Sequence, residues 1–193
     1  MLLEAGILVA FAVAGLCAWL PSRASRDIIA RETGAVRLLR GLQAAQDDHA
    51  GRHGRAGFLE ALVGENHIGI DLIPDDEDRP AAIARHEGYL VAVFLADLEG
   101  RGRGRATDDP IREDFWIAYA WPERFGVTGR RIFVVDSSGS IRYWENSLGT
   151  FDGPERIPSA HLAPAPPGVD YPLDRPRLGF LRSVEWTDVD GSR

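Results

Sequence analysis

The chain opens with an uninterrupted apolar run. Sixteen residues without a charge, Ala5 to Leu20, follow Glu4 and end at Pro21. A helix over the first twenty residues would be about 30 Å long at about 1.5 Å of rise per residue, which is enough to cross the hydrocarbon core of a bilayer. The pattern therefore predicts a transmembrane anchor over residues 1–21.

The same run differs from a cleaved signal peptide. It lacks the basic amino-terminal region of such a peptide, and Glu4 carries the opposite charge. Residues 22–24, Ser-Arg-Ala, match the small-x-small pattern of a cleavage site only poorly. A lipoprotein signal has a small residue before its cysteine, whereas Leu16 precedes Cys17 here. The sequence favours a retained anchor, and a secreted domain whose first residues are removed stays open as an alternative.

Residues 22–50 have the periodicity of an amphipathic helix. Apolar residues recur at spacings of three, four and seven, and arginines occupy other positions. The apolar positions are Ile28, Ala35, Leu39, Leu42 and Ala45. Pro21 removes a helical donor and is expected to kink the helix without ending it. We therefore expect one long helix with an apolar anchor and an amphipathic continuation.

The pattern over residues 51–146 predicts a small globular domain. A Gly-rich stretch ends the long helix, and Phe58–Val63 is predicted to form a short helical turn. Apolar runs then predict three or four antiparallel strands in sequence order: Tyr89–Ala96, Phe115–Trp121, Arg131–Val135 and Ser140–Trp144. The residues Asp-Ser-Ser-Gly at 136–139 would form a hairpin turn. The predicted fold class is α+β, with a long amino-terminal helix packed on a small antiparallel meander sheet of about four strands.

The last segment, residues 147–193, is a predicted Pro-rich tail. Seven of the twelve prolines lie between Pro154 and Pro176, and proline interrupts regular hydrogen bonding. Phe180–Trp186 is the stretch of this tail that could add a last strand.

Composition excludes some functions. The 193 residues leave about 170 beyond the anchor, enough for one modest domain. The net charge of −7 argues against a protein that binds nucleic acid by neutralising phosphates, so no nucleic-acid partner is expected. The single cysteine, Cys17, lies in the apolar run, which leaves the domain without a disulfide or a thiolate metal site.

Candidate catalytic and metal-ligating residues are few. No Ser-His-Asp order, nucleotide-binding loop or pair of carboxylates stands out, so no enzyme and no catalytic residue is predicted. His49 and His53 are four residues apart beside two aspartates and would share one face of a helix. Gly51 and Gly54 indicate that the helix already frays there, and no third ligand has a useful spacing. The sequence therefore predicts no metal site at these histidines.

Two further segments resemble binding motifs. Asp188 and Asp190 stand where an oxygen-ligand calcium loop would begin, but no Glu follows at the spacing that such a loop requires. No cofactor is predicted, with calcium at these two residues as the open alternative. Arg101–Arg105, Arg-Gly-Arg-Gly-Arg, resembles an RNA-binding segment, yet it lies between two predicted strands and close to aspartates. A solvated hairpin loop is the favoured interpretation.

The order of these elements resembles the type IV pilin and pseudopilin superfamily. In those subunits a Glu precedes an apolar amino-terminal helix and a Pro that softens the helix follows it, as Glu4 and Pro21 do here. Residues 129–142 are similar to the GxRxFxVDxxGxIR hairpin of pilin-like proteins. The resemblance extends over roughly residues 1–145.

The resemblance implies a function and a location. It implies a non-enzymatic structural subunit that crosses the bacterial inner membrane once, exposes its domain to the periplasm, and assembles through its amino-terminal helix into a pilus or a protein-secretion pseudopilus. Its partners would be other pilin-like subunits, the membrane and the assembly machinery. Glu4 matches the Glu that is thought to meet the amino-terminal amine of a neighbouring subunit and to set the register. The alternative is a stand-alone membrane-anchored extracytoplasmic domain that binds a ligand or partner.

Overall fold

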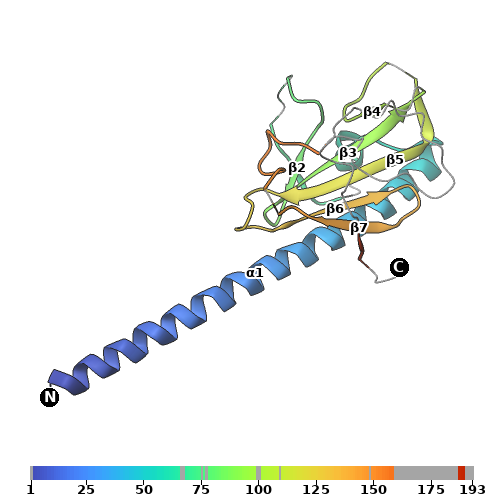
Figure 1. The fold of residues 1–193 in the computed structure, drawn as a ribbon. Helices are drawn as coiled ribbons and strands as arrows, with labels where there is room; N and C mark the ends of the chain where they lie inside the picture. The colour runs from blue at the N-terminus through green and yellow to red at the C-terminus, as the bar shows by residue number, and fades with distance from the viewer. Residues whose placement is uncertain are drawn as a thin grey trace.

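The computed structural model consists of a long helix packed on one large sheet (Figure 1). It describes residues 2–65, 68–74, 76, 78–98, 101–108, 110–147, 149–158 and 187–189, and for residues 2–22, 113, 114 and 188 it describes the backbone alone. These residues form two helices, α1 (Leu2–His53) and α2 (Leu59–Gly64). The strands are β1 (Asp71–Leu72), β2 (Ala84–His86), β3 (Tyr89–Asp97), β4 (Gly102–Arg103), β5 (Ile111–Pro122), β6 (Arg131–Asp136), β7 (Ile141–Glu145) and β8 (Thr187–Asp188).

All eight strands belong to one antiparallel sheet, in the order β1-β2-β3-β5-β6-β7-β8, with β4 paired to β3. The prediction of a small sheet of about four strands is therefore wrong, although the α+β class is compatible with the structure. The four predicted strands are the long central ones, β3, β5, β6 and β7. The others have two or three residues each, which is too short to leave a periodic pattern in the sequence.

The central strands are apolar because both faces of the sheet are covered. Every residue of β3 is buried. Its odd-numbered residues from Tyr89 to Leu95 pack in the same core as the helices, together with Phe133 of β6. Its even-numbered residues from Leu90 to Phe94 pack in a second core on the opposite face. A strand that is buried on both faces has a continuous apolar sequence, which made β3 predictable.

Connecting segments cover the second core. Ile73 comes from the stretch between β1 and β2, and Phe151 and Ile157 come from the stretch after β7. The indole nitrogen Nε1 of Trp121 donates a hydrogen bond to the carbonyl of Gly153 at 2.9 Å, which fastens this last stretch to β5. The first residues of the segment predicted as a Pro-rich tail thus help to close the core.

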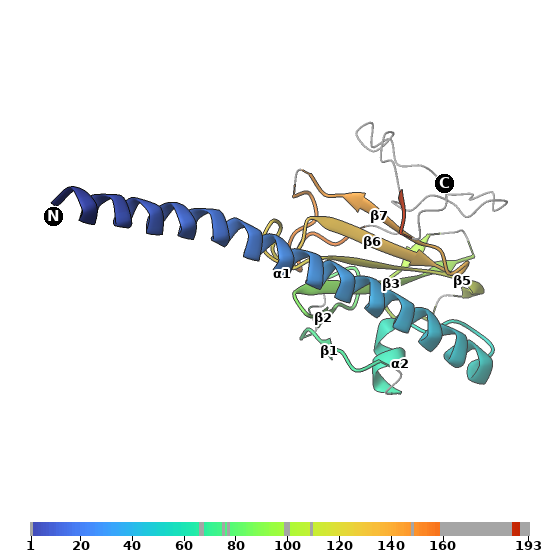
Figure 2. The ribbon, with the colours of Figure 1, turned by 90° about the horizontal axis from the view of Figure 1, so that it is seen from below.

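The two parts of α1 have different surroundings (Figures 1 and 2). Its carboxyl-terminal part lies across the sheet and contacts β2, β5 and β6. The apolar side chains that it buries there are Ile28, Ala35, Leu38, Leu39, Leu42 and Ala45. Residues 23–27 are exposed, and the helix before Ile28 extends away from the sheet (Figure 2). We call residues 2–27 the projecting segment and the remaining described residues the head.

The predicted anchor, residues 1–21, lies outside the part of the chain whose side chains are described. The same is true of Glu4 and of Pro21, through which the α1 backbone continues as helix. Among the residues whose side chains are described, no helix is both long enough and apolar enough to cross a membrane. The anchor therefore stays a prediction from the sequence.

The helix α1 ends later than the sequence indicates. It runs through Gly51 to His53, three residues beyond the predicted end at residue 50. Gly54 then takes a left-handed conformation with φ of 73°, and its N–H donates to the carbonyl of Ala50 at 2.8 Å. This is a common way for glycine to end a helix. The consequence is that His49 and His53 both lie on regular helix.

The turn between β6 and β7 is tight. Gly139 has a φ of 80°, and its N–H donates to the carbonyl of Asp136 at 2.8 Å. The predicted last strand at 180–186 lies outside the described residues, and β8 directly after it pairs with β7.

Candidate functional site

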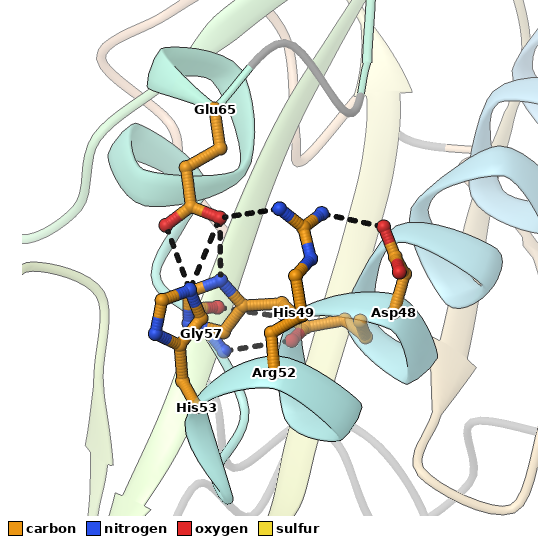
Figure 3. Close-up of polar contacts among 7 residues, drawn as sticks. Asp48, His49, Arg52, His53, Gly57 and Glu65 are labelled. Carbon is orange, nitrogen blue, oxygen red and sulfur yellow. Dashed lines mark hydrogen bonds and ion pairs between the residues drawn. The ribbon is translucent and has the colours of Figure 1, made fainter.

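Three potential metal ligands come together where α1 ends: His49, His53 and Glu65 (Figure 3). The carboxylate oxygen Oε2 of Glu65 lies 3.4 Å from Nδ1 of His49 and 3.3 Å from Nε2 of His53. One possible ligand atom from each residue lies within 4.8 Å of the other two. The centroids of the two imidazole rings are 4.4 Å apart. One carboxylate thus faces two imidazole nitrogens.

Local structure explains how these side chains meet. His49 and His53 are one helical turn apart, so they share one face of α1. The chain then turns at Gly54 and forms α2 beside the end of α1. Glu65 directly follows α2, and its N–H still donates to the carbonyl of Ala61 at 2.9 Å. Its side chain thereby points back to the two imidazoles (Figure 3).

Gln46 fixes the loop beside the histidines. Its side chain is buried and makes two hydrogen bonds to Gly57, donating from Nε2 to the carbonyl and accepting at Oε1 from the N–H, each at 2.8 Å. A Cβ at position 57 would lie 2.8 Å from Cδ2 of His49, so only glycine fits without a shift. The backbone of Gly57 therefore lies against the imidazole of His49 and holds it in place.

Arg52 is the positive charge beside the cluster. Its guanidinium nitrogen Nη1 lies 3.7 Å from Oε2 of Glu65, and Nη2 donates to Asp48 at 2.5 Å (Figure 3). About half of the Arg52 side chain is exposed, as are His53 and Asp48, whereas His49 is only 7% exposed. The cluster thus has a buried inner ligand and an open outer side.

A second polar contact joins α1 to the sheet. Glu32 is buried on α1 and accepts a hydrogen bond from the N–H of Arg130 at 3.0 Å. Its other oxygen lies 3.4 Å from the guanidinium of Arg131. Arg131 also donates to the exposed Glu145 on β7 at 2.6 Å, and this hydrogen bond raises the pKa of the guanidinium. The network holds α1 against β6 and β7.

Tyr89 lies beneath this network. Its hydroxyl donates to the carbonyl of Arg131 at 3.1 Å. Burial, followed by the nearby Glu32 carboxylate, raises the pKa of Tyr89 far above that of an ordinary phenol. Tyr89 therefore stays neutral in the fold and acts as a hydrogen-bond donor rather than as an acid.

Asp97 accounts for the arginine-rich segment. Its buried carboxylate accepts from the N–H of Arg101 and from the side chains of Arg101 and Arg103, at 2.7, 2.7 and 3.2 Å. Burial alone would raise the pKa of Asp97, but these hydrogen bonds and charges outweigh it and lower the pKa below its usual range. Arg101 and Arg103 of this stretch are therefore tied to the end of β3, where the sequence indicated a solvated hairpin loop.

The described residues do not test the site residues that were predicted from the sequence. Glu4 and Pro21 belong to the projecting segment, and Asp188 is the partner of Arg142 in the pairing of β8 with β7. The Asp188 side chain and all of Asp190 lie outside the described residues. The two histidines rejected as a metal site do meet a third ligand, Glu65. It escaped sequence reasoning because its proximity depends on the turn between α1 and α2.

Comparisons of this chain with protein-family models, with curated proteins and with solved structures find no match.

Proposed function

We propose that this chain is a membrane-anchored, pilin-like or pseudopilin-like structural subunit that assembles through the projecting segment of α1. The observation that carries the proposal is the division of α1. Its carboxyl-terminal part is built into the core of the head, whereas residues 2–27 extend beyond it (Figures 1 and 2). A long helix with one end embedded in a small sheet domain is the arrangement that the pilin resemblance implies.

The composition of the projecting segment supports assembly. It contains the apolar run Ala5–Leu20. Ile29, which lies just beyond the end of the projecting segment, is 62% exposed. A long apolar helix that extends from its domain is stable only where a bilayer or other apolar helices cover it. In the proposal, the inner membrane covers the run before assembly, with the head on the periplasmic side. Neighbouring subunits cover it afterwards.

The connection between the head and the projecting segment also fits a structural subunit. Glu32 ties α1 to Arg130 and Arg131, and Leu39 and Leu42 of α1 are fully buried in the core. Regular assembly requires that each head keep a fixed angle to its helix. A buried helix whose Glu32 contacts Arg130 and Arg131 provides that angle. A flexible linker would not.

Glu4 has a defined role in this proposal. Packing of apolar helices would surround its carboxylate with apolar side chains, and an unpaired charge there costs several kcal/mol. The amino-terminal amine of a neighbouring subunit would neutralise it and set the register between subunits. The apolar surface would supply most of the association, and Glu4 would select one alignment.

The test compares Glu4→Ala and Glu4→Gln with the unaltered chain in membranes. Both variants should insert normally, because removal of a charge from the lipid region is favourable. Both should lose crosslinking between projecting segments by at least about tenfold if the carboxylate–amine pair contributes more than about 1.4 kcal/mol. Asp47→Asn, an exposed carboxylate on the embedded part of α1, is the matched control and should crosslink like the unaltered chain.

Equal crosslinking in the unaltered chain and in both Glu4 variants would contradict the role of Glu4. Absence of any crosslinking in the unaltered chain would contradict the assembly proposal itself. That second result would favour the stand-alone anchored domain that binds a ligand or partner.

A further inference from the structure

We propose that His49, His53 and Glu65 bind one divalent transition-metal ion, with Zn²⁺ as the best fit, and that the ion fastens the end of α1 to α2. Two imidazole nitrogens and one carboxylate oxygen are donors that Zn²⁺ accepts readily, and three protein ligands leave a fourth position for water. The site lies at the end of α1 opposite the projecting segment (Figure 1). The inference is therefore independent of the proposed assembly.

The observed distances suit a tetrahedral ion. Ligand atoms that lie about 2.1 Å from Zn²⁺ are about 3.4 Å from one another. The oxygen Oε2 of Glu65 is already 3.4 Å from His49 Nδ1 and 3.3 Å from His53 Nε2. All three residues offer ligand atoms within 4.8 Å. The two nitrogens need to approach by on the order of 1 Å, which rotation of the exposed His53 side chain can supply.

The surroundings hold the inner ligand in position before an ion arrives. His49 is buried against the backbone of Gly57, and the double hydrogen bond from Gln46 fixes that backbone. Ligands held by such supporting contacts bind a metal without a large cost of ordering. The carbonyls at the end of α1 also give this end of the helix a partial negative charge, which favours a cation.

Arg52 opposes the ion in the present arrangement. Its guanidinium lies 3.7 Å from Glu65 and would repel a bound cation. It is also joined to Asp48 at 2.5 Å, and its side chain is half exposed. Arg52 can therefore keep Asp48 as its partner while Glu65 turns to the ion. Removal of the guanidinium should then strengthen metal binding, a result that a purely structural ion-pair network does not predict.

The experiment measures Zn²⁺ binding to the full chain, freed of metal by a chelator and kept in a non-ionic detergent, by isothermal titration calorimetry. The unaltered chain should bind one ion saturably. His53→Gln and Glu65→Gln should each weaken binding at least about tenfold, because loss of a ligand costs no less than loss of a supporting contact. His86→Gln, a histidine on β2 outside the cluster, is the matched control and should bind like the unaltered chain.

Arg52→Gln should tighten binding several-fold. Zn²⁺ should raise the midpoint of thermal unfolding of the unaltered chain and leave that of Glu65→Gln unchanged. About half of the His53 side chain is exposed, so its variant should keep the fold, which circular dichroism checks. The site is refuted if the unaltered chain binds no ion saturably, or if folded His53→Gln binds as tightly as the unaltered chain. An unchanged unfolding midpoint with bound Zn²⁺ would refute the fastening of α1 to α2. An Arg52→Gln variant that binds Zn²⁺ no better than the unaltered chain would refute the proposed competition between Arg52 and the ion.

Discussion

At the scale of single residues, Glu32 is the side chain that joins helix and sheet. It lies 98 residues before Arg130 in the sequence, yet it accepts the backbone N–H of that residue at 3.0 Å. The carboxylate is buried, whereas its partner Arg131 is 42% exposed, so the pair is only partly shielded from water. The contribution of Glu32 therefore comes mainly from its hydrogen bond to the backbone N–H of Arg130.

Replacement of Glu32 by Ala should lower the free energy of unfolding by about 1–3 kcal/mol, because it leaves the Arg130 N–H without its acceptor. Denaturant unfolding of the full chain in detergent measures this loss. Glu145→Ala is the matched control, since Glu145 pairs with the same Arg131 but is 56% exposed. It should cost at most about 1 kcal/mol. Equal losses in the two variants would show that the guanidinium of Arg131, and not the backbone N–H of Arg130, carries the contribution of Glu32.

The residues of the candidate site show what a sequence can and cannot predict at this scale. The spacing of His49 and His53 placed both on one helical face, and α1 does bear them on one face. Glu65 could not be predicted, because its place depends on how the chain turns at Gly54. Gly57 could not be predicted either, since its need to be glycine arises from contact with the buried imidazole.

At the scale of elements, the connection between β3 and β4 is built around one buried carboxylate. Asp97 ends β3 and holds Arg101 and Arg103, the second of which lies in β4. The sheet pairing of Leu95 with Arg103 lies beside this contact. A two-residue strand has few hydrogen bonds of its own, so the contacts of the ionised carboxylate add to the pairing that holds β4 on the sheet.

Stability should therefore depend on the charge of Asp97. Its pKa is lowered in the fold, so the ionised carboxylate stabilises the protein fully above the usual pKa of about 3.9. That contribution disappears as the pH falls through the lower pKa of the folded state. Asp97→Asn should be less stable than the unaltered chain at pH 7, and the difference should shrink below about pH 4.

The measurement is the free energy of unfolding from pH 7 down to about pH 2.5. Asp108→Asn, an exposed carboxylate after the same connection, is the control and should keep the acid dependence of the unaltered chain. A constant difference between Asp97→Asn and the unaltered chain across this range would show that Asp97 contributes by shape and not by charge.

The strands could be predicted only where burial of the strand requires an apolar pattern in the sequence. β3 and β6 lie within one residue of their predicted bounds, because both are buried on both faces. β5 starts four residues before the predicted Phe115, since the charged residues Arg-Glu-Asp at 112–114 interrupt its apolar pattern. The short strands form because they pair with neighbours that are distant in sequence or reached through a turn; these strands are β1, β2, β4 and β8. Such pairing leaves no local signal in the sequence.

At the scale of the whole molecule, the core and the projecting segment are separate in their energetics. Both apolar cores consist of residues from Ala35 onward, and the first buried apolar side chain among the described residues is Ile28. The head should therefore fold without the projecting segment, whereas association between subunits should require it. The two properties can be separated by where the chain begins.

A chain that begins at Ser22 should have the same free energy of unfolding as the full chain within about 0.5 kcal/mol, because it loses no core residue. It should also stay monomeric in sedimentation, while the full chain self-associates in the same detergent buffer. A chain that begins at Leu39 is the control and should not fold, since it lacks Ile28, Glu32 and Ala35. Self-association of the Ser22 chain would place the assembly surface on the head. Its failure to fold would mean that the projecting segment stabilises the head, and the division of α1 on which the proposed function rests would then be wrong.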